Sequence, residues 1–147
     1  MKQIIQNFKT GETMLLELPQ PVASPGTVLI KTSVSLVSIG TERMLVEFGK
    51  ANIFAKARSQ PEKVKQVINK VQKEGLIEAT KAVLNKLDQP ISLGYCNVGK
   101  IIAIGEGVSN FSVGDRVASN GPHAEVVCIS ENLVANVPEN VSDEEAS

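Results

Sequence analysis

Six side chains of this sequence have types that can do chemistry, and they fall in three short segments. They are Ser38, Thr41 and Glu42 in the first, Tyr95 and Cys96 in the second, and His123 in the third. Hydroxyl, carboxyl, phenol and imidazole groups can hold or move a proton, and a thiol can also act as a nucleophile. Each of the six also has a purely structural interpretation, so the surrounding elements decide what it can do.

Composition narrows the class of protein. The net charge of −1 gives no reason to expect binding to nucleic acid. The N-terminus has no apolar signal-peptide region and no apolar run is long enough to cross a bilayer, so we expect a cytoplasmic protein with no membrane partner. Cys96 and Cys128 match no zinc-ribbon or disulfide spacing and are expected to be reduced thiols. At 147 residues with 3% aromatics, the chain predicts a single, mainly aliphatic core.

The segments around the six residues are predicted to be strands at both ends of the chain and helices in the middle. Strands are predicted at residues 15–18, 28–36, 98–104, 123–129 and 133–137, where β-branched or alternating residues are bounded by turn signals. Between them, residues 43–87 are helical in composition, with ten Lys and Arg against five Asp and Glu in residues 43–90. A helical hairpin is predicted over residues 60–88 from three signals. Pro61 suits the start of a helix, Gly75 suits a left-handed C′ position, and Pro90 ends the second helix.

The end of the chain carries a helix-start signal. Ser142 followed three residues later by Glu145 is a capping-box pattern. Since only a turn's length of sequence follows it, we expect the natural protein to continue beyond Ser147.

A spaced glycine motif gives the chain a family resemblance. Residues 104–117 read IGEGVSNFSVGDRV, which predicts a strand, a glycine turn, a loop pinned by Phe111 and a Gly-Asp turn into another strand. Gly105 and Gly107 are followed by neither a third glycine nor a helix, so they are turn residues and not a dinucleotide fingerprint. The motif resembles that of the N-terminal, GroES-like catalytic domain of medium-chain dehydrogenase/reductases. The resemblance implies a mainly β fold: a GroES-like, partly open β-barrel with the helical hairpin inserted.

At the family's zinc-ligand positions this sequence differs. The resemblance implies Cys-Gly-Thr-Asp where residues 39–42 read IGTE, and Gly-His-Glu where residues 94–96 read GYC. Zinc requires about three converging N, S or O ligands, so we expect no metal site. The chain is most similar to zinc-less, bi-domain members of the family. That resemblance implies NAD or NADP as cofactor, bound by a Rossmann domain beyond residue 147, so the 147 residues alone are expected to bind none.

The resemblance also implies roles for the six residues. Catalytic roles fall to Tyr95, Thr41 and Glu42, with the Tyr95 phenol giving a proton to a substrate carbonyl in place of the metal. Ser38, Cys96 and His123 are expected to contact a small-molecule substrate. Gly40 and Thr41 are expected to contact the cofactor.

Structural alternatives remain open for these residues. Tyr95 could instead be buried in the space a zinc ion would fill, and Cys96 could be a small buried apolar residue. Thr41 could be a strand-end hydroxyl bonded to the backbone, and Glu42 an exposed turn acid. His123 could serve packing or lie on the surface.

Two functions follow. The first is the substrate-side domain of a zinc-independent, NAD(P)-dependent oxidoreductase that transfers hydride to or from a carbonyl or activated double bond, inactive and monomeric in isolation. The second is a non-catalytic GroES-like binding module. In that case the helical insert, with its apolar stripe Val64, Val67, Ile68 and Val71 and its basic face of Lys63, Lys65, Lys70 and Lys73, would dock a partner domain or protein.

Overall fold

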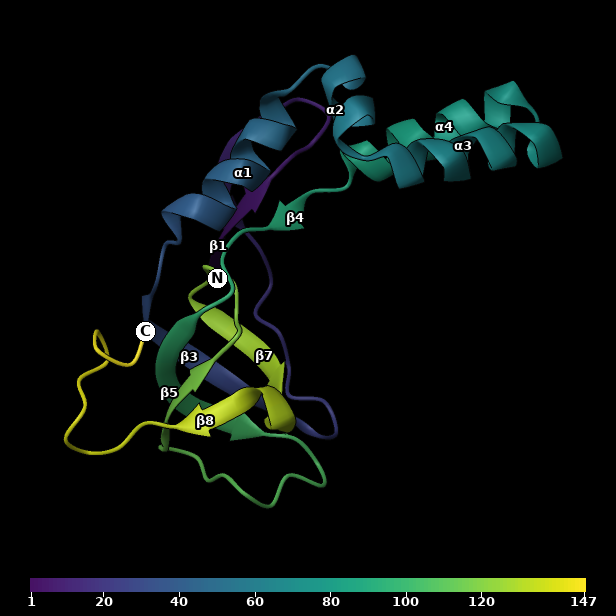
Figure 1. Cartoon of the computed structure of the whole chain (residues 1–147). Coiled ribbons are helices and arrows are strands. Elements are labelled where there is room, and N and C mark those ends of the chain that lie inside the picture. Colours follow the sequence, from purple (N-terminus) through teal and green to yellow (C-terminus); the bar gives the residue numbers. More distant parts are fainter. The chain divides into compact units, whose positions relative to one another are not determined.

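The chain folds into two compact units. A computed structural model describes the backbone of residues 1–147 and every side chain except that of Glu74. The β unit consists of Met1–Ile4, Leu15–Glu42 and Ser92–Ser147, and the helical unit consists of Ile5–Met14 and Arg43–Ile91. Figure 1 labels the helices and strands.

The β unit contains a five-stranded sheet in which every pairing is antiparallel. In spatial order its strands are β7 (Val126–Ser130), β3 (Thr27–Ser35), β5 (Asn97–Ile104), β6 (Arg116–Ser119) and β8 (Val134–Asn136). The sheet is open, with β7 and β8 at its edges. The strands predicted at residues 28–36, 98–104 and 133–137 are confirmed. The strand predicted from residue 123 begins at Val126 instead, and His123 lies in the segment before it.

Branched aliphatic side chains form the core of this sheet. Val28 and Ile30 of β3, Ile101 of β5 and Val117 of β6 are completely or almost completely buried in one cluster. Phe111, in the loop before β6, packs against that cluster, as the glycine motif predicts. Burial of apolar area is the main stabilising contribution to such a sheet.

A second sheet has three short strands in the order β2 (Thr13–Glu17), β1 (Lys2–Gln6) and β4 (Ile91–Ser92). Each of these strands contributes residues to both units. Only β2 is predicted from the sequence. β1 lacks an alternating apolar pattern and β4 has two residues, so neither carries a signal that periodicity can detect.

Four helices separate β3 from β4: α1 (Ile39–Lys50), α2 (Ile53–Ser59), α3 (Pro61–Glu74) and α4 (Leu76–Asp88). The predicted hairpin is confirmed as α3 and α4, which lie side by side (Figure 1). Pro61 is the first residue of α3, where its missing N–H costs no hydrogen bond. No helix among the described residues combines the length and the apolar character that a membrane span needs.

Gly75 joins the two helices of the hairpin, and its conformation differs from the prediction. It ends α3 and begins α4 with φ 93° and ψ 163°. Its φ is positive, as expected of a C′ glycine, but its ψ lies far from the left-handed helical value near 47°. This extended region with positive φ is accessible essentially only to glycine, which explains the residue type.

A buried lysine ties the helical unit together. The Lys56 ammonium donates to the Phe8 carbonyl at 2.5 Å and to the Gly49 carbonyl, near the end of α1, at 2.8 Å. It also lies 6.0 Å from the ring centre of Phe48. Burial lowers the pKa of this ammonium from its ordinary value of 10.5. Its two acceptors belong to separate segments of the chain, so Lys56 holds them together.

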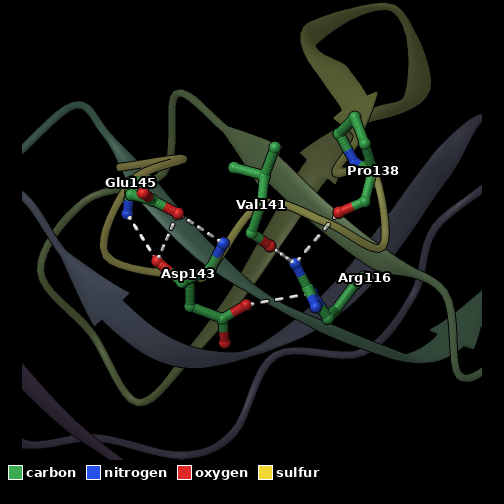
Figure 2. Close-up of polar contacts among 6 residues, drawn as sticks. Arg116, Pro138, Val141, Asp143 and Glu145 are labelled. Carbon is green, nitrogen blue, oxygen red and sulfur yellow. Dashed lines mark hydrogen bonds and ion pairs between the residues drawn. The ribbon is translucent and has the colours of Figure 1, made fainter.

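The C-terminal segment is anchored to β6 by Arg116 (Figure 2). One guanidinium nitrogen, Nη2, donates to the carbonyls of Pro138, at 3.3 Å, and Val141. The Arg116 Nε lies 3.0 Å from a carboxylate oxygen of Asp143. A single side chain from the sheet therefore holds three points of residues 138–143.

The predicted capping box is present at the end of this segment. The backbone N–H and hydroxyl of Ser142 donate to the Glu145 carboxylate at 3.0 and 2.9 Å, and the Glu145 N–H donates to the Ser142 hydroxyl at 3.2 Å. These bonds with Ser142 lower the pKa of the Glu145 carboxyl.

Candidate functional site

Two of the six candidate residues form a buried acid–histidine pair inside the β unit. Glu42 and His123 are 7% and 6% exposed, and a Glu42 carboxylate oxygen lies 2.8 Å from the His123 Nε2. The other ring nitrogen, Nδ1, lies 2.9 Å from the hydroxyl of Ser35, at the end of β3. Because both ring nitrogens have partners, the imidazole is held in one orientation.

The second carboxylate oxygen of Glu42 faces the start of α1. It accepts the backbone N–H of Ser38 at 2.9 Å, and the Glu42 N–H donates to the Ser38 carbonyl at 2.9 Å. A carboxylate is favoured at this end of a helix, where backbone N–H groups are unpaired. The alternative that Glu42 is an exposed turn acid is wrong, because the helix begins at Ile39 and turns this side chain toward His123.

His123 also touches the loop that carries Tyr95. The His123 backbone N–H donates to the Leu93 carbonyl at 2.8 Å. Gly94 adopts φ 90°, and a methyl carbon added there would lie 2.6 Å from the His123 backbone nitrogen and 2.7 Å from two ring atoms. Gly94 is therefore required both by the backbone conformation and by the close approach of the histidine.

Tyr95 itself projects from this loop with 46% of its surface exposed. The alternative that it is buried is therefore wrong, and its hydroxyl has no hydrogen-bond partner among the described residues. Cys96, the next residue, is half-buried, and its carbonyl accepts the Leu36 N–H at 3.2 Å. The loop is thus tied down on both sides of Tyr95, while the phenol remains accessible.

Gly40 and Thr41 lie in the first turn of α1, and both are exposed. Thr41 is therefore a helix residue, and the alternative of a strand-end hydroxyl is wrong. Hydrogen bonds join Ser38, Glu42 and His123 into one network, whereas Thr41 and Tyr95 have no bond to that network among the described residues.

Sequence reasoning missed two residues that contact this network: Ser35, which is hydrogen-bonded to His123, and Gly94, which lies against the His123 ring. Ser35 alternates in a predicted strand like any other polar residue, and nothing in the sequence connects it with a histidine 88 positions later. Gly94 did carry a signal, since it precedes Tyr95 in a Leu-Gly-Tyr sequence. The reason for the glycine became visible only with the His123 ring against it.

The positions that would hold zinc in related dehydrogenases offer few ligand atoms. Ile39 has none, Tyr95 is a phenol, and Cys96 is a single thiol. Among the described residues, no three His, Cys, Asp or Glu side chains converge so that they could hold a metal ion.

Comparisons with known proteins agree with this architecture. Residues 64–139 match the profile of the alcohol dehydrogenase GroES-like domain. Comparison with curated protein sequences gives no significant match.

Solved structures with the same fold include three whose descriptions are informative. A mycobacterial protein complexed with NADPH is 24% identical, with a TM-score of 0.63 over 99% of this chain and 36% of its own. A quinone oxidoreductase from Coxiella burnetii is 23% identical, with a TM-score of 0.62 over 99% and 39% of the two chains. The human synaptic vesicle membrane protein VAT-1 homolog-like protein is 19% identical, with a TM-score of 0.64 over 99% and 38%.

The chain thus spans 36–39% of the length of these three structures. At these identities the likeness establishes the fold, and the profile match covers more than half of the sequence. The chain belongs to the alcohol dehydrogenase GroES-like domain family.

Proposed function

We propose that this chain is the substrate-side domain of a zinc-independent, NAD(P)-dependent oxidoreductase. The observation that carries the proposal is the family match combined with Tyr95, an accessible phenol on an anchored loop at a position where zinc-containing relatives hold a ligand. A phenol can donate a hydrogen bond to a carbonyl oxygen and then a proton, which is the work that a Lewis acid would otherwise do.

The substrate class we propose is a small carbonyl compound or an activated double bond. Structures with this fold are described as quinone oxidoreductases and as an enoyl reductase. In these substrates, negative charge develops on an oxygen as the carbon is reduced. A neutral phenol at Tyr95 suits that oxygen, and the exposed hydroxyl of Thr41 is proposed as a second polar contact.

The cofactor is proposed to be held by sequence outside these 147 residues, with Gly40 and Thr41 facing it. A bound nicotinamide would supply the hydride. Within this chain, the proposed contribution is to bind and orient the substrate, and to hold a proton on the Tyr95 oxygen.

The first test is to read the coding frame beyond Ser147. A strand followed by Gly-x-Gly-x-x-Gly within roughly forty residues supports the proposal, because that pattern cradles a pyrophosphate at a helix N-terminus. The gene product is then assayed for NADPH oxidation with quinones, enones and aldehydes, before and after chelator treatment. We expect activity that survives the chelator and falls about 10²-fold or more in Tyr95→Phe. A stop codon at Ser147, or loss of activity with the chelator, would refute the proposal.

A second candidate function, a binding module, is favoured by one observation on the helices. Val64, Val67 and Val71 of the predicted apolar stripe are half-buried, but Ile68 is exposed. Leu76 and Ile77 at the start of α4 are exposed as well. Sedimentation of the 147-residue protein over a range of concentrations tests this candidate. Self-association that Ile77→Ser abolishes would favour the binding module, and a monomer at every concentration would favour the enzyme domain.

A further inference from the structure

We propose that Glu42 and His123 are positioning residues for Tyr95, holding the loop of residues 93–96 so that the phenol faces the substrate. This rests on the proposed role of Tyr95 as proton donor. It assigns Glu42 and His123 a different task from the catalytic and substrate-contact roles that the family resemblance implies.

Burial is the first argument. At 7% and 6% exposure, Glu42 and His123 present almost no surface to a substrate, whereas Tyr95 is 46% exposed. The polar atoms of the pair are also occupied by protein partners: Ser35 and Glu42 on the imidazole, and Ser38 on the carboxylate. Glu42 and His123 therefore act on a substrate indirectly, through the loop that they hold in place.

The second argument is the contact between His123 and the loop. Its backbone N–H holds the Leu93 carbonyl, and its ring lies directly against Gly94. The ring in turn is fixed by Glu42, which is fixed by the start of α1. The chain of contacts therefore runs from α1 through Glu42 and His123 to Gly94, the residue before Tyr95.

The third argument is the anchor on the far side of Tyr95. The Cys96 carbonyl is held by the Leu36 N–H, directly after β3, the strand that ends with Ser35. Attachments on the two sides, at Leu93 and Gly94 before Tyr95 and at Cys96 after it, restrict the backbone of Tyr95. A substitution at His123 leaves its backbone bond to Leu93 in place and removes the contact of the ring with Gly94.

The composition of the chain allows a direct measurement. Tyr95 is the single tyrosine and there is no tryptophan, so emission excited in the tyrosine absorption band, above that of the four phenylalanines, comes from this phenol. Emission anisotropy and quenching by acrylamide are measured for wild type, His123→Ala, Glu42→Ala and Glu42→Gln. Circular dichroism sets a temperature at which each variant is folded.

We expect quenching to rise, by at most about twofold because Tyr95 is already 46% exposed, and anisotropy to fall, in His123→Ala and Glu42→Ala. In Glu42→Gln both are expected to stay near wild type, since an amide can keep both contacts: its oxygen can accept the Ser38 N–H while its NH2 donates to the His123 Nε2. Val28→Ala is the matched control, because it removes core volume in the sheet without touching the loop. It should lower the melting temperature and leave the emission unchanged.

Unchanged emission in His123→Ala and Glu42→Ala would overturn the proposal. An equal change in Val28→Ala would also overturn it, because Tyr95 would then report general loosening. Neither measurement uses cofactor or substrate, so either failure leaves the proposed function standing. Conversely, a gene product without NAD(P)H-dependent activity refutes that function whatever the emission shows.

Discussion

The β unit and the helical unit bury different kinds of side chain. In the β unit, branched aliphatic residues from neighbouring strands are completely enclosed, and Glu42 and His123, the acid and base buried there, are paired with each other. In the helical unit, Ile5 and Ala79 are the buried apolar residues among the described side chains, while Phe54 is 83% exposed. Its buried cation, Lys56, binds backbone carbonyls.

This difference indicates where rigidity comes from. Strands β3 and β5 are far apart in sequence and share a buried apolar cluster, so we expect the sheet to open as a unit. The helices are local structures, and most helical stability in proteins comes from tertiary packing of an apolar face. A unit with little such packing is expected to open at a lower free energy than the sheet. The candidate site lies within the β unit, so we expect it to be held more rigidly than the residues of the helical unit.

The largest expected effect separates the two units directly. Ile101→Ala should lower the free energy of unfolding by about 3–4 kcal/mol, since it leaves a cavity in the sheet core. Ile68→Ala, an identical substitution on exposed α3, should change it by less than about 0.5 kcal/mol. Urea denaturation followed by circular dichroism measures both. Equal losses would mean that the hairpin is as well packed as the sheet.

The next effect compares a glycine from each unit. Gly94→Ala should cost about 2–3 kcal/mol, because its φ is 90° and the methyl group meets the His123 backbone. Gly49→Ala, inside α1, gains helix propensity of up to about 1 kcal/mol, but its methyl group meets the buried Gln6 side chain, which must shift. Its φ carries no strain, so the net cost should be smaller than that of Gly94→Ala.

The Gly94 prediction has an internal control in the double variant Gly94→Ala/His123→Ala. Removing the ring should recover part of the cost of the alanine, because two of the three close contacts are to ring atoms. Additive losses in a double-mutant cycle would show that the ring and Gly94 are not in contact.

A smaller effect tests the two hydrogen bonds that Lys56 donates to backbone carbonyls in the helical unit. Lys56→Met keeps the apolar stem but leaves two carbonyls without their donor, which should cost about 1–3 kcal/mol at pH 7. The pKa of Lys56 is lowered from 10.5, so just below pH 10.5 the unfolded chain binds more protons than the folded one. Wild-type stability relative to Lys56→Met should therefore rise with pH in that window. A falling difference would mean that the charged form is favoured by folding.

The smallest effect concerns the end of the chain. The pKa of the Glu145 carboxyl is lowered by its bonds to Ser142, so its contribution is present above the ordinary value of 4.5 and is lost as the pH falls through the folded value. Glu145→Gln should abolish this pH dependence. We expect faster exchange of the Ser142 amide hydrogen, which donates to this carboxylate, in the variant at pH 6, with β6 unaffected. Exchange that also accelerates in β6 would show that the cap and the sheet open together.

Much of the β unit could be predicted from the sequence, because period-two apolar strands and the glycine motif are strong local signals. The hairpin was equally visible through Pro61, Gly75 and the spacing of its valines. The predicted start of the helices was too late, since Ile39 to Glu42 resemble the end of a strand until Glu42 is seen to reach back to Ser38. The Glu42–His123 pair joins positions 81 apart, and no periodicity or motif encodes such a contact.

The Ser142–Glu145 cap has a consequence for protein engineering. The costly step in making a helix is nucleation, in which several residues are fixed before the first hydrogen bonds repay the lost entropy. Here Ser142 and Glu145 have already made the capping bonds, and Arg116 fixes the residues just before them to the sheet. A helix-forming segment fused after Ser147 should therefore extend from this prepared start with a defined direction. That makes this end of the chain a suitable point for a rigid rather than a flexible fusion.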